Sequence, residues 1–175
     1  MSNINSIDKN LNEVTNLFQL GNYHEAIDLL KSLEKENENF LINWYLGHSL
    51  FKLHLYDEAI LEVKKSISLN TEDSLNLNFL GEIFLEKNEY NEALNCFEKA
   101  LILDNSNVNT IKNLIKSNLI IGNIKKSEQY LVQLLEKNPQ NYGYLYSLIR
   151  INAKYLTENE YKKIQNNSND LNSYN

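Results

Sequence analysis

A short motif that occurs twice in this chain, 34 residues apart, constrains the fold more than any other feature. The letters LG at 46–47 recur at 80–81, and YDEAI at 56–60 recurs as YNEAL at 90–94. In each copy, one small residue lies inside a helical pattern and a second lies near the start of the next. Self-similarity at a period of roughly 20–50 residues is typical of stacked structural repeats, so the chain is predicted to repeat one helical hairpin.

The same frame extends towards both ends of the chain. GNYHEAI at 21–27 is an upstream copy, GNIKKS at 122–127 is a downstream copy, and Pro139 follows this last copy. Apolar or small residues follow at helical spacing in every copy, which predicts one buried stripe per helix. The four stripes are Ala26, Leu30 and Leu33; Ala59, Val63 and Ser66; Ala93, Phe97 and Ala100; and Ser127, Leu131 and Leu134.

Two kinds of residue indicate how the predicted hairpins close. The turns contain Gly21, Asn88 or Gly122, which suit the left-handed backbone that ends a helix. Gly47 and Gly81 have no side chain at the points where two antiparallel helices should cross. A side chain at either position would overpack the crossing, at a cost of roughly 1–3 kcal/mol.

The period and the positions of the small residues resemble those of the tetratricopeptide repeat (TPR) family. The resemblance implies an all-α fold, a right-handed superhelical solenoid of antiparallel helix hairpins. The array is expected to span 6–156, and a capping box at Thr157 and Glu160 predicts the start of a further helix. The expected parts are a flexible N-terminus at 1–5, repeats at about 6–38, 40–72, 74–106 and 108–140, a half-repeat at 142–156, a C-terminal capping helix at 157–166 and a flexible tail at 167–175.

Several positions depart from the family pattern. Glu13 stands where an apolar residue is expected, so the first helix is predicted to be frayed or shifted in register. Ile115 and Ile149 stand at the glycine position of the fourth repeat and of the half-repeat. Packing around these two residues is therefore predicted to be wider than around Gly47 and Gly81.

Charge and cysteine content narrow the classes of partner and location. The chain has 175 residues, a net charge of −6 and one cysteine, Cys96. A single cysteine cannot form an internal disulfide, which is compatible with a reducing compartment, and a cytoplasmic location is predicted. An acidic balance disfavours nucleic acid as the main partner, because phosphate neutralisation supplies most of such affinity. No apolar run approaches the roughly 20 residues of a membrane helix, so no membrane insertion is expected.

No arrangement of residues predicts catalysis, a metal site or a cofactor. His24, His48 and His54 fall at unrelated repeat positions, without the spacing of metal ligands. The sequence contains no glycine-rich phosphate loop. These residues are therefore expected not to form an enzyme and to need no cofactor.

The resemblance places ligand binding on the first helix of each repeat, because those helices line the concave groove in this family. The implied groove residues are Trp44, Tyr45, His48, Phe51 and Lys52; Asn78, Phe79 and Glu82; Lys112, Asn113 and Lys116; and Tyr146, Arg150 and Lys154. The aromatic residues predict either an interaction surface or rings that pack between neighbouring first helices. The cations likewise predict either ligand contacts or ion pairs with Glu82 and Glu86.

The predicted function is a protein–protein interaction module or scaffold that binds a peptide or protein segment in its groove. A partner with an apolar or aromatic anchor and an acidic stretch would complement these residues. The carboxylate clamp of chaperone-binding members is absent, since Leu11, Thr15 and Tyr45 occupy its positions in the first frame. Two alternatives stay open: the N-terminal TPR region of a longer bacterial enzyme, such as a TPR-linked sulfotransferase or glycosyltransferase, and self-association through stacked terminal helices.

Overall fold

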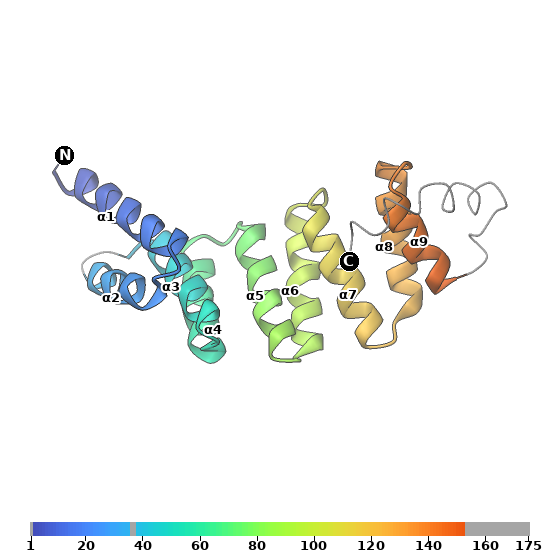
Figure 1. The fold of residues 1–175 in the computed structure, drawn as a ribbon, viewed down its shortest axis with the longest axis horizontal. Coiled ribbons are helices and arrows are strands. Elements are labelled where there is room, and N and C mark those ends of the chain that lie inside the picture. Colours follow the sequence, from blue (N-terminus) through green and yellow to red (C-terminus); the bar gives the residue numbers. More distant parts are fainter. Residues whose placement is uncertain (1, 36–37, 153–175) are drawn as a thin grey trace. The chain divides into compact units, whose positions relative to one another are not determined.

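The computed structural model describes residues 2–35 and 38–152, and every regular element in these ranges is an α-helix (Figure 1). The helices are α1 (Ser2–Gln19), α2 (Tyr23–Glu34), α3 (Phe40–Lys52), α4 (Tyr56–Leu69), α5 (Ser74–Glu86), α6 (Tyr90–Leu103), α7 (Val108–Ile120), α8 (Ile124–Lys137) and α9 (Tyr142–Ile151). Helix α1 begins at Ser2, so residues 2–5 are helical where a flexible N-terminus was expected. The expected capping helix at 157–166 and the tail at 167–175 lie outside the described residues, and the repeat boundaries stay a prediction.

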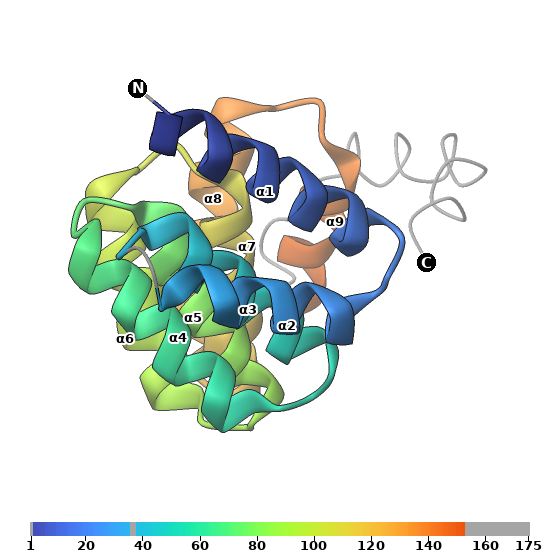
Figure 2. The same cartoon turned by 90° about the vertical axis from the view of Figure 1, so that its left-hand side faces the viewer.

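The chain forms two compact units, residues 1–105 and residues 106–175, which we call the N-terminal unit and the C-terminal unit. The N-terminal unit contains the hairpins α1–α2, α3–α4 and α5–α6, and α1 to α4 are seen from another side in Figure 2. In the C-terminal unit, α7 pairs with α8, and α9 packs against α8. Each unit is described by itself below.

The first helices after α1 all begin with the same kind of cap. Asn39, Asp73, Asn107 and Asn141 precede α3, α5, α7 and α9, and they follow one another at 34-residue intervals. The side-chain oxygen of each accepts a hydrogen bond from a backbone N–H two or three residues further on. This bond satisfies a donor that the first helical turn leaves unpaired, so each first helix carries its own start signal.

The hairpin turns adopt the left-handed backbone conformation predicted for them. Gly21, Asn88 and Gly122 have φ angles of 78°, 61° and 78°, which confirms the prediction. His54 is a fourth residue of this kind, with φ of 60°, and stands at the equivalent place between α3 and α4. His54 thus adopts a backbone conformation that is energetically more favourable for glycine or asparagine, because the turn of the repeat requires it.

The two glycines of the N-terminal unit lie where the helices of a hairpin touch. A Cβ atom placed on Gly47 would lie 2.5 Å from Cγ2 of Val63, and one on Gly81 would lie 2.5 Å from a ring carbon of Phe97. Both distances are shorter than real side chains tolerate, so the predicted close approach is confirmed. Ile115 is the equivalent residue on α7, where the hairpin carries a side chain at the same position.

The four predicted stripes form the interior of the hairpins. All of their members are buried, which confirms the helical pattern read from the sequence. In α1 the register is shifted, because Val14 is fully buried while its neighbour Glu13 is exposed. The helix is continuous through Glu13. The shift therefore places an apolar side chain in the core at the position that Gly47 holds in the next repeat.

Candidate functional site

The predicted groove residues of the N-terminal unit come from α3 and α5, and their rings contact one another. The centroids of His48 and Phe79 are 3.5 Å apart with planes inclined by only 7°, and Phe51 lies edge-on to Phe79 at 5.4 Å. Further edge contacts extend this row of rings to α1 through Tyr45 and Phe18. We call the set the aromatic row: Phe18, Tyr23, Trp44, Tyr45, His48, Phe51, Tyr56 and Phe79.

The aromatic row is packed rather than open. Phe79 is only 5% exposed, and Trp44, Tyr45, His48 and Phe51 are half-buried. The hydroxyl groups of Tyr45 and Thr15 lie 3.1 Å apart, at hydrogen-bond distance. The rings thus pack between neighbouring first helices, as the second of the two interpretations predicted. A role in ligand binding stays a prediction for these residues.

Burial changes the chemistry of the one histidine in the row. The pKa of His48 falls from 6.5 to about 4, chiefly because burial penalises the charged imidazolium and secondly because Lys52 lies nearby. At neutral pH, His48 is therefore an uncharged flat ring stacked on Phe79. Lys52 itself is exposed at the end of α3.

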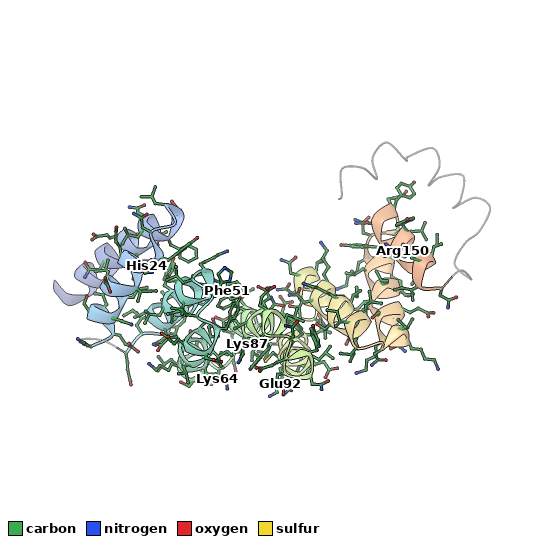
Figure 3. All side chains as sticks on the ribbon, turned by 60° about the horizontal axis from the view of Figure 1, so that its bottom comes forward. His24, Phe51, Lys64, Lys87, Glu92 and Arg150 are labelled. Carbon is green, nitrogen blue, oxygen red and sulfur yellow. The ribbon has the colours of Figure 1, made fainter. Side chains whose placement is uncertain are left out.

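The remaining predicted polar residues of the N-terminal unit interact with each other. Asn78 is buried, and its amide donates a 2.8 Å hydrogen bond to Oε1 of Glu82, one turn further along α5. Figure 3 shows Phe51 on one side of this unit, with Lys64 and Glu92 of the second helices α4 and α6 on the opposite side. The first-helix face therefore carries most of the aromatic row, and the second helices present charges.

The C-terminal unit contains a cavity of about 400 Å³ between α7, α8 and α9, which we call the α7–α9 cavity. Its lining residues are Lys112, Ile115, Leu119, Leu131, Leu134, Tyr144, Ser147, Arg150 and Ile151. Leu131 and Leu134 are almost fully buried and form an aliphatic floor. No acidic side chain is present among these described lining residues, so Lys112 and Arg150 set the charge of the opening.

The two cations of the cavity lie beside different tyrosines. Nζ of Lys112 is 6.0 Å from the ring centre of Tyr144, and the guanidinium carbon of Arg150 (labelled in Figure 3) is 5.9 Å from that of Tyr146. Within the described part of this unit, neither cation forms a salt bridge. Both are exposed, so each has donors available to an anion.

The structure brings only some of the predicted groove residues of this unit to the cavity. Lys112 and Arg150 line it, whereas Lys116, Asn113 and Tyr146 do not. Lys116 is exposed one turn after Lys112, Asn113 is half-buried, and Tyr146 is exposed. The last predicted residue, Lys154, lies outside the described residues.

Two tetratricopeptide repeat profiles match the chain, one over residues 11–69 and the other over residues 74–107. Together the matched segments cover more than half of the sequence and include the aromatic row. The chain belongs to the tetratricopeptide repeat family. Its fold class is accordingly that of an all-α helical-repeat solenoid.

Comparison with individual proteins supports the TPR fold. The bovine (Bos taurus) BBSome complex member BBS4 is 29% identical over 138 residues, which cover 76% of this chain but only 26% of the relative. The solved structure of MamA, from residue 41 to its end, from Desulfovibrio magneticus RS-1 superposes with a TM-score of 0.74 at 16% identity, covering 95% of this chain and 93% of that one. The second TPR domain of human RPAP3, in complex with the HSP70 peptide SGPTIEEVD, has a TM-score of 0.59 at 23% identity, covering 62% of this chain and 92% of that one.

The TPR chain has a charge asymmetry that its net charge conceals. Residues 1–105 contain eight Lys and Arg against 18 Asp and Glu, whereas residues 106–152 contain six against two. The described part of the C-terminal unit is therefore cationic in an acidic chain. Counting charges by repeat rather than over the whole sequence would have revealed this contrast.

Most of the residues that line the cavity were not predicted from the sequence. Ile115 was recognised only as a departure from glycine, and Leu119, Tyr144 and Ser147 were not singled out. A signal was present in the repeat frame, because Tyr45, Phe79, Asn113 and Ser147 follow one another at 34-residue intervals. At this repeat position, Tyr45 and Phe79 carry an aromatic ring, whereas Ser147 of α9 carries only a hydroxymethyl group. Ser147 lines the cavity.

Other kinds of site find little support in the described ranges of this TPR chain. No group of three His, Cys, Asp or Glu residues within them could hold a metal ion. Cys96 is buried, and burial raises the pKa of its thiol to about 11, so the thiol stays protonated at neutral pH. None of the described helices combines the length and the apolar character needed to span a bilayer.

Proposed function

We propose that this TPR chain is a protein-interaction module that binds a segment of a partner protein along its first helices. The observation that carries the proposal is the α7–α9 cavity, which combines an aliphatic floor with two exposed cations. Ligand sites in proteins are commonly concave and mostly apolar, with a few polar groups that fix orientation. The RPAP3 domain, a structural neighbour, is a TPR domain in complex with a peptide, which supports this class of function.

The expected partner segment contains an apolar or aromatic anchor and acidic residues, in a protein of the cytoplasm. The anchor would supply most of the binding energy, because a few buried side chains dominate interfaces. The acidic residues would accelerate encounter with the cationic C-terminal unit, since complementary charges mainly affect the association rate. Lys116 of α7 is exposed and suits this second role.

The experiment compares charge reversal on the two kinds of helix. Proteins captured by the full chain are identified, and the best-enriched partner is titrated against wild type, Lys116→Glu and Lys64→Glu. Both lysines are exposed, but Lys116 lies on a first helix and Lys64 on a second helix. We expect Lys116→Glu to slow association about tenfold and to flatten its salt dependence. Loss of binding in Lys64→Glu with none in Lys116→Glu would place the partner on the second helices and contradict the proposal.

A further inference from the structure

We propose that the α7–α9 cavity is an anchor pocket for an internal peptide motif in which an aromatic side chain lies between two carboxylates. The proposal rests on the proposed function and assigns its ligand contacts to named residues. Three observations carry it: the residue that is missing from the cavity, the size and lining of the space, and the positions of the two cations.

The missing residue is found by comparing equivalent positions. In the N-terminal unit, Phe79 of α5 fills the space beside the preceding first helix, where it stacks on His48 and meets Phe51 edge-on. Ser147 of α9 holds the position of Phe79, two periods later, and Leu119 of α7 holds that of Phe51. Both Ser147 and Leu119 line the cavity. The space therefore lies where the repeat frame places an aromatic ring in the N-terminal unit.

Size and lining fit a ring supplied by a ligand. The cavity of about 400 Å³ lies within the range of roughly 300–1,000 Å³ typical of ligand pockets. Its walls are aliphatic at Ile115, Leu131 and Leu134, and each of these is at most 9% exposed. The hydroxyl of Ser147 donates a 2.9 Å hydrogen bond to the carbonyl of Gly143, so it is satisfied without a ligand. An apolar group entering the cavity thus meets aliphatic walls and an already paired hydroxyl.

The positions of the cations indicate what flanks the anchor. The head group of Lys112 lies beside Tyr144 and that of Arg150 beside Tyr146, and two residues turn a helix by about 200°. The two cations therefore lie on different sides of α9, and both line the cavity. Two carboxylates, one on either side of the aromatic residue, would therefore each meet one cation.

The separate positions of the two cations favour an internal motif over a chain end. The head groups of Lys112 and Arg150 lie beside two different rings, those of Tyr144 and Tyr146. They are consequently arranged for two separate side-chain carboxylates. The C-terminal carboxylate of the ligand is not required, and a peptide with a blocked C-terminus should bind as well as a free one.

The test uses short labelled peptides and the full chain. The probe has a tryptophan with a glutamate on either side, and its C-terminus is amidated. Three further peptides replace the tryptophan by alanine, replace the glutamates by lysines, or leave the C-terminus free. Fluorescence anisotropy gives the dissociation constants. We expect the alanine peptide to bind at least about 30-fold more weakly, the lysine peptide not to bind, and the free C-terminus to change affinity less than about threefold.

Protein variants locate the binding to the cavity. Ser147→Phe fills the cavity with a ring from the chain itself and should therefore abolish binding. Circular dichroism checks that the variant keeps its helices. Lys112→Glu and Arg150→Glu should each weaken binding about tenfold. The matched control is Lys125→Glu, because Lys125 is exposed on α8 and does not line the cavity. It should leave affinity within about twofold of wild type.

Four results would overturn the proposal. The tryptophan and alanine peptides could bind equally, or no peptide of the panel could bind. Ser147→Phe could bind like wild type. Finally, binding could appear only after Glu158→Gln and Glu160→Gln, which would assign the cavity to the chain's own C-terminal residues. If a captured partner still depends on Lys116 but not on Ser147, the anchor pocket is wrong while the proposed function stands.

Discussion

The two units share one repeat frame and differ in what fills the spaces between its helices. In the N-terminal unit, the crossing at Gly81 is closed by the ring of Phe97, and Phe79 fills the gap between first helices. In the C-terminal unit, Ile115 stands at the glycine position and Ser147 at the ring position, and a cavity lies beside both. The residues at a few equivalent positions thus decide whether the space between two helices is filled by a side chain or left as a cavity. The helices themselves are the same in both units.

The difference extends to charge. The N-terminal unit is strongly acidic and its aromatic row is largely covered, whereas the described part of the C-terminal unit is cationic and carries an open apolar space. Binding to the first helices is therefore expected to depend most on the C-terminal unit. The N-terminal unit would act mainly as packed support.

The largest expected effect concerns the tight crossing. Gly81→Leu should lower the free energy of unfolding by about 4 kcal/mol, above the usual ~1–3, because the obstacle is the fully buried ring of Phe97. Ile115→Leu, the matched change in the other unit, keeps volume and should cost less than about 1.5 kcal/mol. Urea unfolding followed by circular dichroism measures both, and the fluorescence of Trp44 reports the N-terminal unit. Equal losses would show that the two crossings do not differ.

The next effect depends on pH and belongs to the aromatic row. His48 has a folded pKa of about 4 against 6.5 when unfolded, so the unfolded chain binds more protons between these values. Its contribution to stability is complete above pH 6.5 and is lost as the pH falls to 4, about 3 kcal/mol in all. Urea melts at a series of pH values measure the free energy of unfolding. We expect His48→Phe to lack the part of its loss between pH 6.5 and pH 4 that comes from His48. The control His24→Gln changes an exposed histidine of α2 and should retain the wild-type profile.

A smaller effect is expected when the cavity of the C-terminal unit is filled by a ring, as the equivalent space is in the N-terminal unit. Ser147→Phe should raise the stability of the C-terminal unit by about 1–2 kcal/mol, because the ring enters an aliphatic space that already exists. Ser147→Ala removes only the hydrogen bond to Gly143 and should change little. Thermal melts of the three proteins give the comparison. A destabilised phenylalanine variant would mean that the space is not shaped for a ring.

The smallest effect tests what the units have in common. Asp73→Ala and Asn107→Ala each remove a helix cap, one in each unit, and each should cost about 1 kcal/mol. Glu72→Ala, next to the first cap and exposed, serves as the control in the same melts. A much larger loss in one unit would indicate that its first helix depends on the cap rather than on packing.

Much of the fold follows from periodicity alone. Burial of Ala59, Ala93 and their stripes was predictable because helical spacing places these residues on one face of each helix. The left-handed turns at Gly21 and Gly122 follow from the freedom of glycine, whereas His54 adopts the same conformation only because the frame requires it. The register shift of α1 was one of the two outcomes predicted from Glu13, and the choice between a shifted and a frayed helix depends on packing with other helices.

The candidate site was less predictable for a physical reason. A sequence shows which side chains are present, but a cavity is made by a side chain that is absent. Ser147 is an ordinary residue by itself, and it becomes informative only when Phe79 is seen to fill the equivalent place. The ring contacts within the aromatic row, such as the stack of His48 on Phe79, likewise could not be predicted, because they depend on how neighbouring helices are placed in space.

The repeated caps have a genetic consequence. Because Asn107 and Asn141 start their helices independently of the residues that pack between them, a repeat can exchange its filling side chain and keep its helix. Phenylalanine codons differ from two of the six serine codons by a single base, so one point mutation can separate a filled gap from an open one. A family with this construction can gain or lose a binding site without rebuilding its scaffold.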